Sequence, residues 1–271
     1  VGAAHLKNKP VFRDFFADVF FPPKSRRLLI AISFELLTDT LPPKMVLKLN
    51  FMSYNSLNYY GGNMTVITTN TQRPHPGKTK LQLNNMLEVT KAFGDMGITA
   101  RVSRVVFGQN AGCLVFSTFS ANFTEAMENT QRVFSSEMWS KVQMRLDDNP
   151  SSDIIMPLNL VRVAAGEMKP SHRVMNFRWY LMKKDKMSMA MEMFEEVKGM
   201  CEKVDVNPEL LTPVTGDNMS SMIIAYGATS LEASGKAFDQ MGMTEEFQSL
   251  LSRAAEVGEL HYGWMTVPAD Q

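Results

Sequence analysis

The chain has 271 residues, of which 45% are hydrophobic and 21% charged, and its 28 Lys and Arg residues balance 28 Asp and Glu residues. This composition is typical of a soluble globular protein with room for two domain-sized units, and the zero net charge gives no electrostatic reason to expect a nucleic-acid or membrane partner. Two cysteines cannot build a disulfide framework, so we expect buried free thiols and a reducing, cytoplasmic setting.

Residues 1–63 differ from the rest of the chain, because they contain two Pro-Pro pairs and no clean hydrophobic period. Their apolar run, Leu28 to Ser33, is soon interrupted by Glu35 and is too short for a signal peptide or a membrane span. We expect a poorly packed or non-native N-terminal extension, with the natural protein beginning at Met64. The codons of Gly61-Gly62-Asn63 can contain a bacterial ribosome-binding sequence just ahead of that start. The alternative is a genuine extension of the native protein.

Residues 64–168 give a regular succession of strand and helix signals. Met64 to Thr69 is alternating and β-branched, as strands are, and Lys78 to Met96 carries apolar residues at helical spacing. The next predicted elements are a strand over Ile98 to Phe107, a hairpin over Gly108 to Gly112, a strand over Cys113 to Phe119, a helix from Phe123 to Phe134, a further helix after Ser136, and a strand over Ile154 to Ala164. This β-α-β-β-α-β order is that of a ferredoxin-like unit.

Residues 169–271 give the same succession again. The predicted elements are a strand over Arg173 to Met182, a helix from Asp185 to Val204, a strand over Leu210 to Val214, a hairpin over Gly216 to Asn218, a strand over Met219 to Ala228, a helix over Leu231 to Met241, a further helix after Thr244, and a strand over Leu260 to Val267. The sequence therefore predicts an α+β protein of two tandem ferredoxin-like units.

An ungapped shift of 108 positions superimposes the two units. Four positions are identical in both copies: Gly108/Gly216, Asn110/Asn218, Glu137/Glu245 and Arg145/Arg253. The apolar positions match more widely, which is expected when two copies keep one packing scheme and diverge elsewhere.

On these features, residues 64–271 resemble the dimeric α+β-barrel superfamily, which includes the antibiotic-biosynthesis-monooxygenase-like and NIPSNAP-like families. The likeness lies in the Gly-bearing hairpin, the third strand, and a helix in which an acid precedes an aromatic residue, at Glu137-Met138-Trp139 and Glu245-Glu246-Phe247. The resemblance implies two four-stranded antiparallel sheets that face one another with helices outside. Both sheets would come from one polypeptide here, as a pseudo-dimeric barrel. A homodimer of the whole chain is a further expectation.

Strand parity indicates which side chains could face a cavity between the two sheets. Along 174–181, the face with Met175, Phe177, Trp179 and Leu181 is entirely apolar, and we expect it to pack under helices. The opposite face would then line the cavity, with Val174, Asn176, Arg178 and Tyr180, His172 in the same parity, and Val66, Thr68 and Asn70 at the matching positions of the first copy. Along 98–103 the same reasoning predicts that Arg101 and Ser103 face the cavity.

The candidate ligand-binding residues are thus Arg101, Ser103, His172, Asn176, Arg178, Tyr180 and Tyr226, and the further candidates are His261, Tyr262 and Trp264. The parity of Tyr226 and of the three further candidates is ambiguous. An arginine there could hold a substrate carboxylate or pair with a nearby acid. His172 could be a general base or a solvent-exposed residue near the linker. The tyrosines could orient a ligand or be half-buried strand residues.

Three functions fit these expectations. The first is a protein that binds a small, partly apolar organic molecule, with cofactor-independent chemistry of the oxygenase, cyclase or isomerase type. The second is a haem protein similar to chlorite dismutases, for which His75, His172 and His261 are the histidines after Met64. The third is a non-catalytic assembly module, which a barrel without a cavity would favour. Neither a metal-ligand cluster with zinc spacing nor a phosphate-binding loop is present in the sequence.

Overall fold

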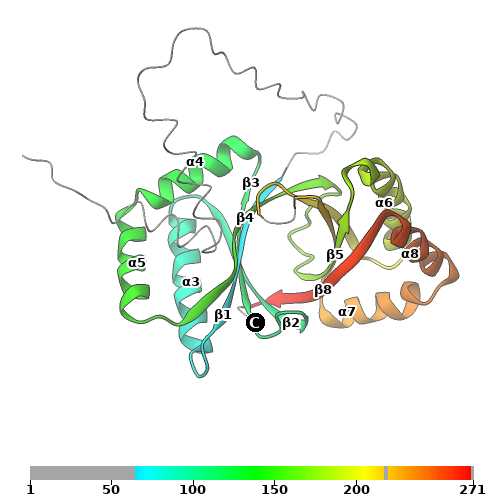
Figure 1. Ribbon diagram of the computed structural model, residues 1–271. Helices are drawn as coiled ribbons and strands as arrows, with labels where there is room; N and C mark the ends of the chain where they lie inside the picture. The colour runs from blue at the N-terminus through cyan, green and yellow to red at the C-terminus, as the bar shows by residue number, and fades with distance from the viewer. Residues whose placement is uncertain (1–64, 217–218, 270–271) are drawn as a thin grey trace, which may run out of the picture. The chain divides into compact units, whose positions relative to one another are not determined.

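The computed structural model describes residues 65–216 and 219–269, and the part from residue 65 onward belongs to one compact unit (Figure 1). The predictions for residues 1–63, including a start at Met64, lie outside the described residues. In the described part of the chain, no helix is both long enough and apolar enough to cross a membrane.

Both copies contain the predicted order of elements. The first comprises β1 (Val66–Pro74), α3 (Thr79–Asp95), β2 (Thr99–Gly108), β3 (Leu114–Ser120), α4 (Phe123–Phe134), α5 (Glu137–Asp148) and β4 (Ser152–Ala165). The second comprises β5 (Val174–Met182), η2 (Lys184–Lys186), α6 (Met187–Glu202), β6 (Asn207–Pro213), β7 (Ser221–Ala228), α7 (Leu231–Ala237), the π-helical turn η3 (Phe238–Gly242), α8 (Glu245–Val257) and β8 (Gly258–Pro268).

The strands form one closed antiparallel barrel in the order β1-β3-β2-β8-β5-β7-β6-β4. Each copy contributes a four-stranded ferredoxin-like sheet, and the two sheets join edge to edge. One seam runs between β2 and β8, from Ser103↔Pro268 to Gly108↔Trp264, and the other joins β4 to β6. Because both seams are hydrogen-bonded, neither sheet keeps a free edge. The predicted fold class is therefore confirmed.

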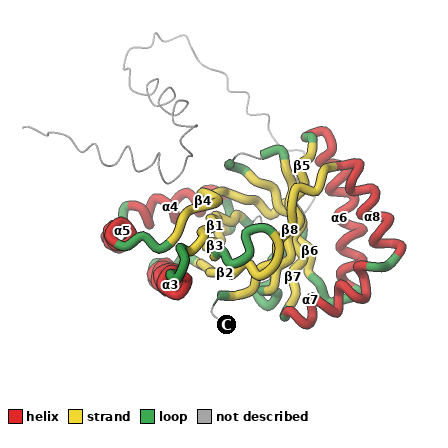
Figure 2. Tube along the Cα trace, turned by 60° about the horizontal axis from the view of Figure 1, so that its bottom comes forward, coloured by secondary structure: helices red, strands yellow, loops and turns green. Residues whose placement is uncertain are grey.

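Helices cover the outside of this barrel. Figure 1 and Figure 2 show α3, α4 and α5 on one side of the strands and α6, α7 and α8 on the other. In the first copy Phe93 of α3 packs edge-on against Phe116 of β3, with ring centroids 5.2 Å apart. In the second copy, Phe194 of α6 is fully buried against Leu210 and Met222. The helices thereby bury the outer face of each sheet.

Matching contacts in the two copies support the 108-residue shift. Arg145 of α5 pairs with Glu88 of α3, and at the shifted positions Arg253 of α8 pairs with Glu196 of α6. These side chains are half exposed, and exposed ion pairs contribute only about 0–1 kcal/mol. The helix caps also correspond, because Asn122 and Ser230 each accept a hydrogen bond from the backbone N–H three residues on. The duplication has therefore preserved geometry more closely than sequence.

The repeated glycine Gly108 offers a test of the β2–β8 seam. Gly108 has φ +84°, and a Cβ there would lie 2.2 Å from the backbone oxygen of Gly263. Gly112 in the same hairpin has φ +87° but has open space around it. We expect Gly112→Ala to cost about 1–2 kcal/mol of unfolding free energy through left-handed backbone strain alone. Gly108→Ala should cost roughly 1–3 kcal/mol more through the clash. Urea denaturation of both variants measures the difference, and equal losses would contradict the close approach of the two strands.

Candidate functional site

A cavity of about 290 Å³ lies inside the barrel. Alternate side chains of the strands point inward and form its wall, among them Ile67, Thr69 and Thr71 of β1, Arg101, Ser103 and Val105 of β2, Val115, Ser117 and Phe119 of β3, and Met175, Phe177 and Trp179 of β5. Its volume lies at the lower end of the range typical of small-molecule sites, roughly 300–1,000 Å³.

One wall of the cavity is aromatic. Phe177 and Trp264 are cross-strand partners, as are Trp179 and Tyr262, so all four side chains lie on the same inner face of β5 and β8. Phe177 stacks on Trp264 with ring centroids 4.7 Å apart, and Trp179 lies 5.2 Å from Tyr262. The indole Nε1 of Trp179 is buried without a hydrogen-bond partner. This wall can bind a flat apolar molecule.

Two charged side chains, Arg101 of β2 and Glu209 of β6, lie in the same cavity. Glu209 is only 2% exposed, and its Oε1 accepts a 3.2 Å hydrogen bond from Nδ2 of Asn207. Its Oε2 has no partner, and neither has Nε of Arg101. The Arg101 guanidinium lies over the ring of Phe119, 5.2 Å from its centroid. The residues of the cavity wall therefore include a buried acceptor and a buried donor that no other protein group satisfies.

The environment of Glu209 changes its acidity. Burial raises the pKa of its carboxyl to about 7, while the charge of Arg101 and the hydrogen bond from Asn207 act in the opposite direction. Burial also lowers the pKa of the Arg101 guanidinium, and Glu209 opposes that shift. At neutral pH, Glu209 can therefore either accept or give up a proton.

The two ends of the cavity differ. Glu209, Ser103 and Thr266 are buried at one end, where Met168 of the segment between the two copies also contributes to the wall. Asn207 fixes this segment by donating a 2.8 Å hydrogen bond to the backbone oxygen of Glu167. We call this end the base.

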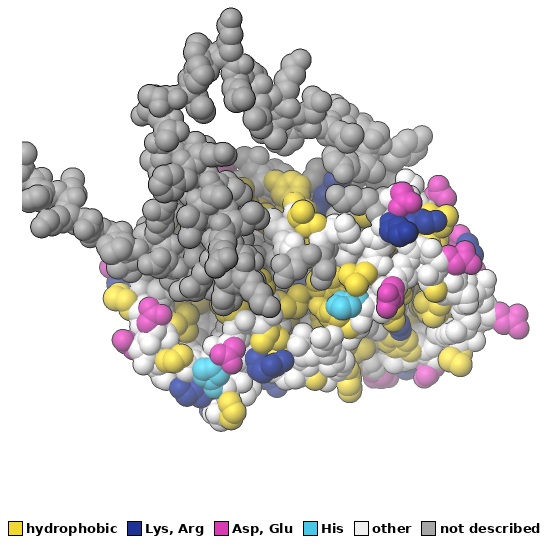
Figure 3. Space-filling model, viewed as in Figure 1, with side chains coloured by type: hydrophobic (Ala, Val, Ile, Leu, Met, Phe, Trp, Pro, Cys, Tyr) yellow, Lys and Arg dark blue, Asp and Glu magenta, His cyan; other side chains and the backbone are white. Residues whose placement is uncertain are grey.

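At the opposite end, exposed residues of the hairpins and of β8 line the cavity: Gln109, Thr215, Gly216 and His261. This end is the mouth. Figure 3 shows hydrophobic side chains on the face of the barrel between the two groups of helices.

Strand register places the polar and aromatic groups along the cavity. Glu209 and Phe177 both pair with Ala225 of β7, whereas Trp179 pairs with Ile223. Trp179 is thus one inward-facing step closer to the mouth, about 7 Å along the strand. A ligand that reaches Glu209 must therefore pass the aromatic wall.

The parity predicted for 174–181 is wrong. Met175, Phe177 and Trp179 line the cavity, as Ile67 and Thr69 do in β1, so Val66, Thr68 and Asn70 point outward together with Val174 and Asn176. Arg178 and Tyr226 lie against Phe238 and Phe247, and Tyr180 lies beneath α6. In a closed barrel covered by helices both strand faces are buried, so an apolar face does not identify the helix side.

The parity predicted for β2 agrees with the structure, in which Arg101 and Ser103 line the cavity. Their role in ligand binding stays a prediction. His172 precedes β5 and does not line the cavity; its Nδ1 lies 3.0 Å from Oγ of Ser171, and its Nε2 is 3.9 Å from Asp205, too far for a hydrogen bond. Burial raises the pKa values of Tyr180 and Tyr226. Neither tyrosine lines the cavity.

Sequence reasoning missed Glu209, because the strand predicted over Leu210 to Val214 began three residues after the start of β6 at Asn207. The internal repeat contained the signal that could have found it. Arg101 and Glu209 are 108 positions apart, so they occupy the same place in the two copies. A charged residue at each of two equivalent inward positions indicates a polar end of the cavity.

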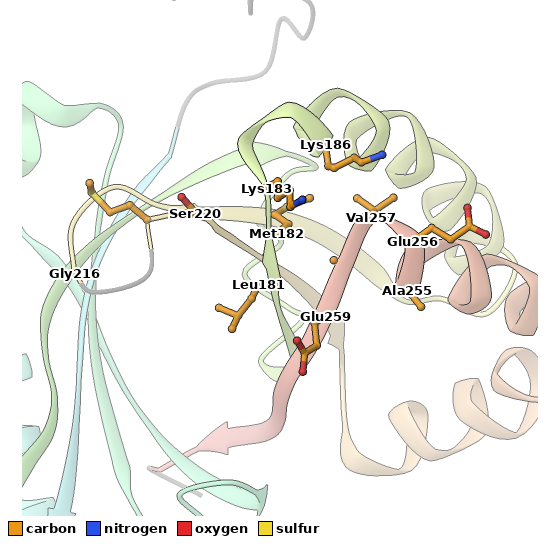
Figure 4. A pocket seen from close by; sticks show the side chains of 12 residues that line it. Leu181, Met182, Lys183, Lys186, Gly216, Ser220, Ala255, Glu256, Val257 and Glu259 are labelled. Atoms are coloured by element: carbon orange, nitrogen blue, oxygen red, sulfur yellow. The ribbon is translucent and has the colours of Figure 1, made fainter.

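A second depression, of about 710 Å³, lies on the outside near the end of β5 and the start of β8. Figure 4 shows its charged residues Lys183, Lys186, Glu256 and Glu259 as sticks. Lys186 and Glu256 do not point toward a common centre in that view. The arrangement lacks the converging polar groups of a binding site.

The described residues do not fit a haem. Of the three histidines, His75 lies beside Asp153 at 3.2 Å, His172 lies outside the barrel cavity, and His261 is exposed at its mouth. The cavity is too small for a porphyrin. The spaces between the second sheet and its helices measure only about 30 and 20 Å³, and no histidine lines either of them. Among the residues described, no group of three His, Cys, Asp or Glu side chains could hold a metal ion.

No protein-family model matches the sequence, and no curated protein is significantly similar to it. Solved structures are similar to it. A protein of Fusobacterium nucleatum, provisionally named a monooxygenase, has a TM-score of 0.50 and 6% identity, over 76% of this chain and 92% of that one. An anthrone oxidase-like protein has a TM-score of 0.49 and 13% identity, over 75% of this chain and 91% of that one. A chlorite dismutase of Candidatus Nitrospira defluvii has a TM-score of 0.44 and 9% identity, over 80% of this chain and 95% of that one. The match at a TM-score of 0.50 shows a common fold, and its 6% identity leaves the reaction open.

The raised pKa of Glu209 predicts a pH-dependent cost to folding. Between its ordinary value of 4.5 and about 7, the unfolded chain has lost this proton while the folded protein keeps it, so stability falls as pH rises. Glu209→Gln removes the cost. We expect the variant to gain up to about 3 kcal/mol relative to the native protein between about pH 4 and pH 8. Urea denaturation across this range measures the gain. The exposed Glu256→Gln is the control, and an equal gain there would contradict the assignment to Glu209.

Proposed function

We propose that this chain, which has the dimeric α+β barrel fold with two ferredoxin-like units in tandem, binds a small, partly apolar organic molecule inside the barrel and catalyses proton transfer on it without a cofactor. The observation that carries the proposal is the free Oε2 of Glu209, buried in a cavity with an aromatic wall.

The wall and the base together define the molecule. A ring system stacks on Phe177, Trp179 and Trp264, and its polar end reaches Arg101 and Glu209 at the base. A fully apolar molecule would leave the two unpaired polar atoms of the base unsatisfied, which is unfavourable. A fully polar molecule would gain nothing from the aromatic wall. The ligand therefore combines an apolar ring or chain with one polar end.

Glu209 and Arg101 have complementary roles in the proposed chemistry. Glu209 removes a proton from an acidic C–H or O–H group of the bound molecule, and its pKa of about 7 suits that task at neutral pH. The guanidinium of Arg101 stabilises the negative charge left behind, in a site where few other polar groups compete. Cofactor-independent oxygenation, cyclisation and isomerisation can all start with such a step. A barrel filled by side chains would have favoured a non-catalytic assembly module. The cavity inside this barrel argues against that alternative.

The cellular setting belongs to the same proposal. Cys113 and Cys201 are both buried free thiols, and burial raises the pKa of Cys201 to about 12. Thiols of this kind suit the reducing cytoplasm, where we place the protein.

Hydrogen–deuterium exchange tests the proton transfer. The probe is 2-tetralone, a bicyclic ketone with acidic C–H groups next to its carbonyl, dissolved with the protein in deuterated buffer near neutrality. We expect NMR to show deuterium entering these positions faster than in buffer alone. Glu209→Gln should lower the protein-dependent rate by a factor of about 10²–10⁴, the usual contribution of a general base.

Binding must be measured alongside exchange. Quenching of tryptophan fluorescence reports the probe, because Trp179 and Trp264 line the cavity. Glu209→Gln should still bind 2-tetralone, whereas Ser117→Phe should fill the cavity and abolish binding; Ser252→Phe on the exposed face of α8 is its control. If both the native protein and Glu209→Gln bind 2-tetralone and give equal rates of deuterium exchange, Glu209 is not the base.

A further inference from the structure

The charges of Arg101 and Glu209 do not neutralise each other by direct contact. No carboxylate of the described residues lies within 4.0 Å of the Arg101 guanidinium, although Glu209 lines the same cavity. Each of the two side chains also keeps one buried polar atom without a hydrogen bond. Leaving the buried Nε–H of Arg101 without a partner is costly, since this donor has lost water and gained no hydrogen bond. The base of the cavity thus has room, and an electrostatic reason, for an additional anion.

The two residues occupy equivalent positions of the two copies, so they approach the cavity from opposite sides of the barrel. Arg101 enters from β2 and Glu209 from β6, and the strand order places these two strands well apart in the ring. A ligand group between them is approached from one side by the guanidinium of Arg101. From the other side it is approached by Oε2 of Glu209, which accepts a hydrogen bond when ionised and donates one when protonated.

Charge balance decides which form of Glu209 is compatible with an anion. With Glu209 ionised, the base is already neutral overall, and an anionic ligand would leave one negative charge in excess among aromatic rings. With Glu209 protonated, the ligand's charge balances that of Arg101, and the carboxyl O–H donates to the ligand's second oxygen. The proton comes from solvent and is held on Oε2.

We infer, on the basis of the function proposed above, that the base of the barrel binds an organic monoanion, a carboxylate on a ring system, together with one proton that Glu209 takes up. The carboxylate accepts from the guanidinium of Arg101 and from the protonated Glu209, and its ring system lies against Phe177 and Trp264. Toward such an anion the protonated Glu209 is the proton donor of the proposed transfer, whereas toward a neutral ketone such as 2-tetralone the ionised Glu209 is the base.

The groups around Glu209 are consistent with this coupling. Arg101 from β2 is the charged group that acts on it directly, and Asn207 of its own strand donates to Oε1. Arg173, just before β5, acts on Arg101 and adds positive charge near the base. Thr266 of β8 and Ser103 of β2 are the uncharged polar neighbours in the cavity wall. Proton uptake at neutral pH agrees with a pKa of about 7 for Glu209.

Calorimetric titration of the full chain tests the inference with two matched probes, 2-naphthoate and its neutral amide, 2-naphthamide. Titrations in two buffers of different ionisation enthalpy give the number of protons taken up. We expect close to one proton per naphthoate at about pH 8 and almost none at about pH 6, with the affinity falling roughly tenfold per pH unit above pH 7. Naphthamide should bind without proton uptake and with constant affinity.

Two variants assign the effect. Glu209→Gln carries a permanent N–H donor, so it should bind naphthoate with the same affinity at both pH values and take up no proton. Arg101→Gln should lose roughly 10–100-fold in affinity for naphthoate and keep its affinity for naphthamide. Circular dichroism confirms that both variants are folded.

The outcomes separate this inference from the proposed function. Naphthoate binding that is independent of pH, or that needs no proton, would overturn the inference and leave the binding cavity intact. If neither naphthoate nor naphthamide binds and 2-tetralone exchange is also absent, the proposed function fails as well.

Discussion

The structure depends on the two seams that close the barrel, β2 with β8 and β4 with β6. A ferredoxin-like unit by itself covers one face of its sheet with helices and leaves the other face bare. Joining two such sheets edge to edge removes four free strand edges and encloses both bare faces in one interior. The cavity, its aromatic wall and the burial of Glu209 all follow from this closure, because each would be open to water if the sheets separated.

The sequence was sufficient for the architecture, since periodicity and the 108-residue shift are local signals that survive divergence. Arg145 and Arg253 illustrate this, because both identical residues make the same ion pair in the structure. Orientation of the strands was harder to predict. The alternation in 174–181 separates an apolar face from a mixed one, but it cannot tell which face meets helices when both are buried. Arg178 and Tyr180 therefore lie beneath helices, while Phe177 and Trp179 form the cavity wall.

Duplication within one chain explains how the base of the cavity acquired opposite charges. In a homodimer, equivalent positions of the two subunits must carry the same residue, so two arginines or two glutamates would meet across the twofold axis. Here the two copies diverged separately, and Arg101 corresponds to Glu209. The aromatic wall shows the same asymmetry, because Phe177 and Trp179 of the second copy correspond to Thr69 and Thr71 of the first. One half of the cavity is thus aromatic, and each half supplies one charge to the base.

The acidity of Glu209 reports directly on whether the barrel is closed and its base shielded from water. Carbon-13 NMR of the glutamate carboxyl groups can follow it, with the Glu209 signal identified by its absence from the spectrum of Glu209→Gln. We expect that signal to titrate with a midpoint near pH 7. A midpoint near the ordinary value of 4.5 would mean that water reaches the carboxyl, and it would contradict both the enclosed base and the chemistry assigned to it.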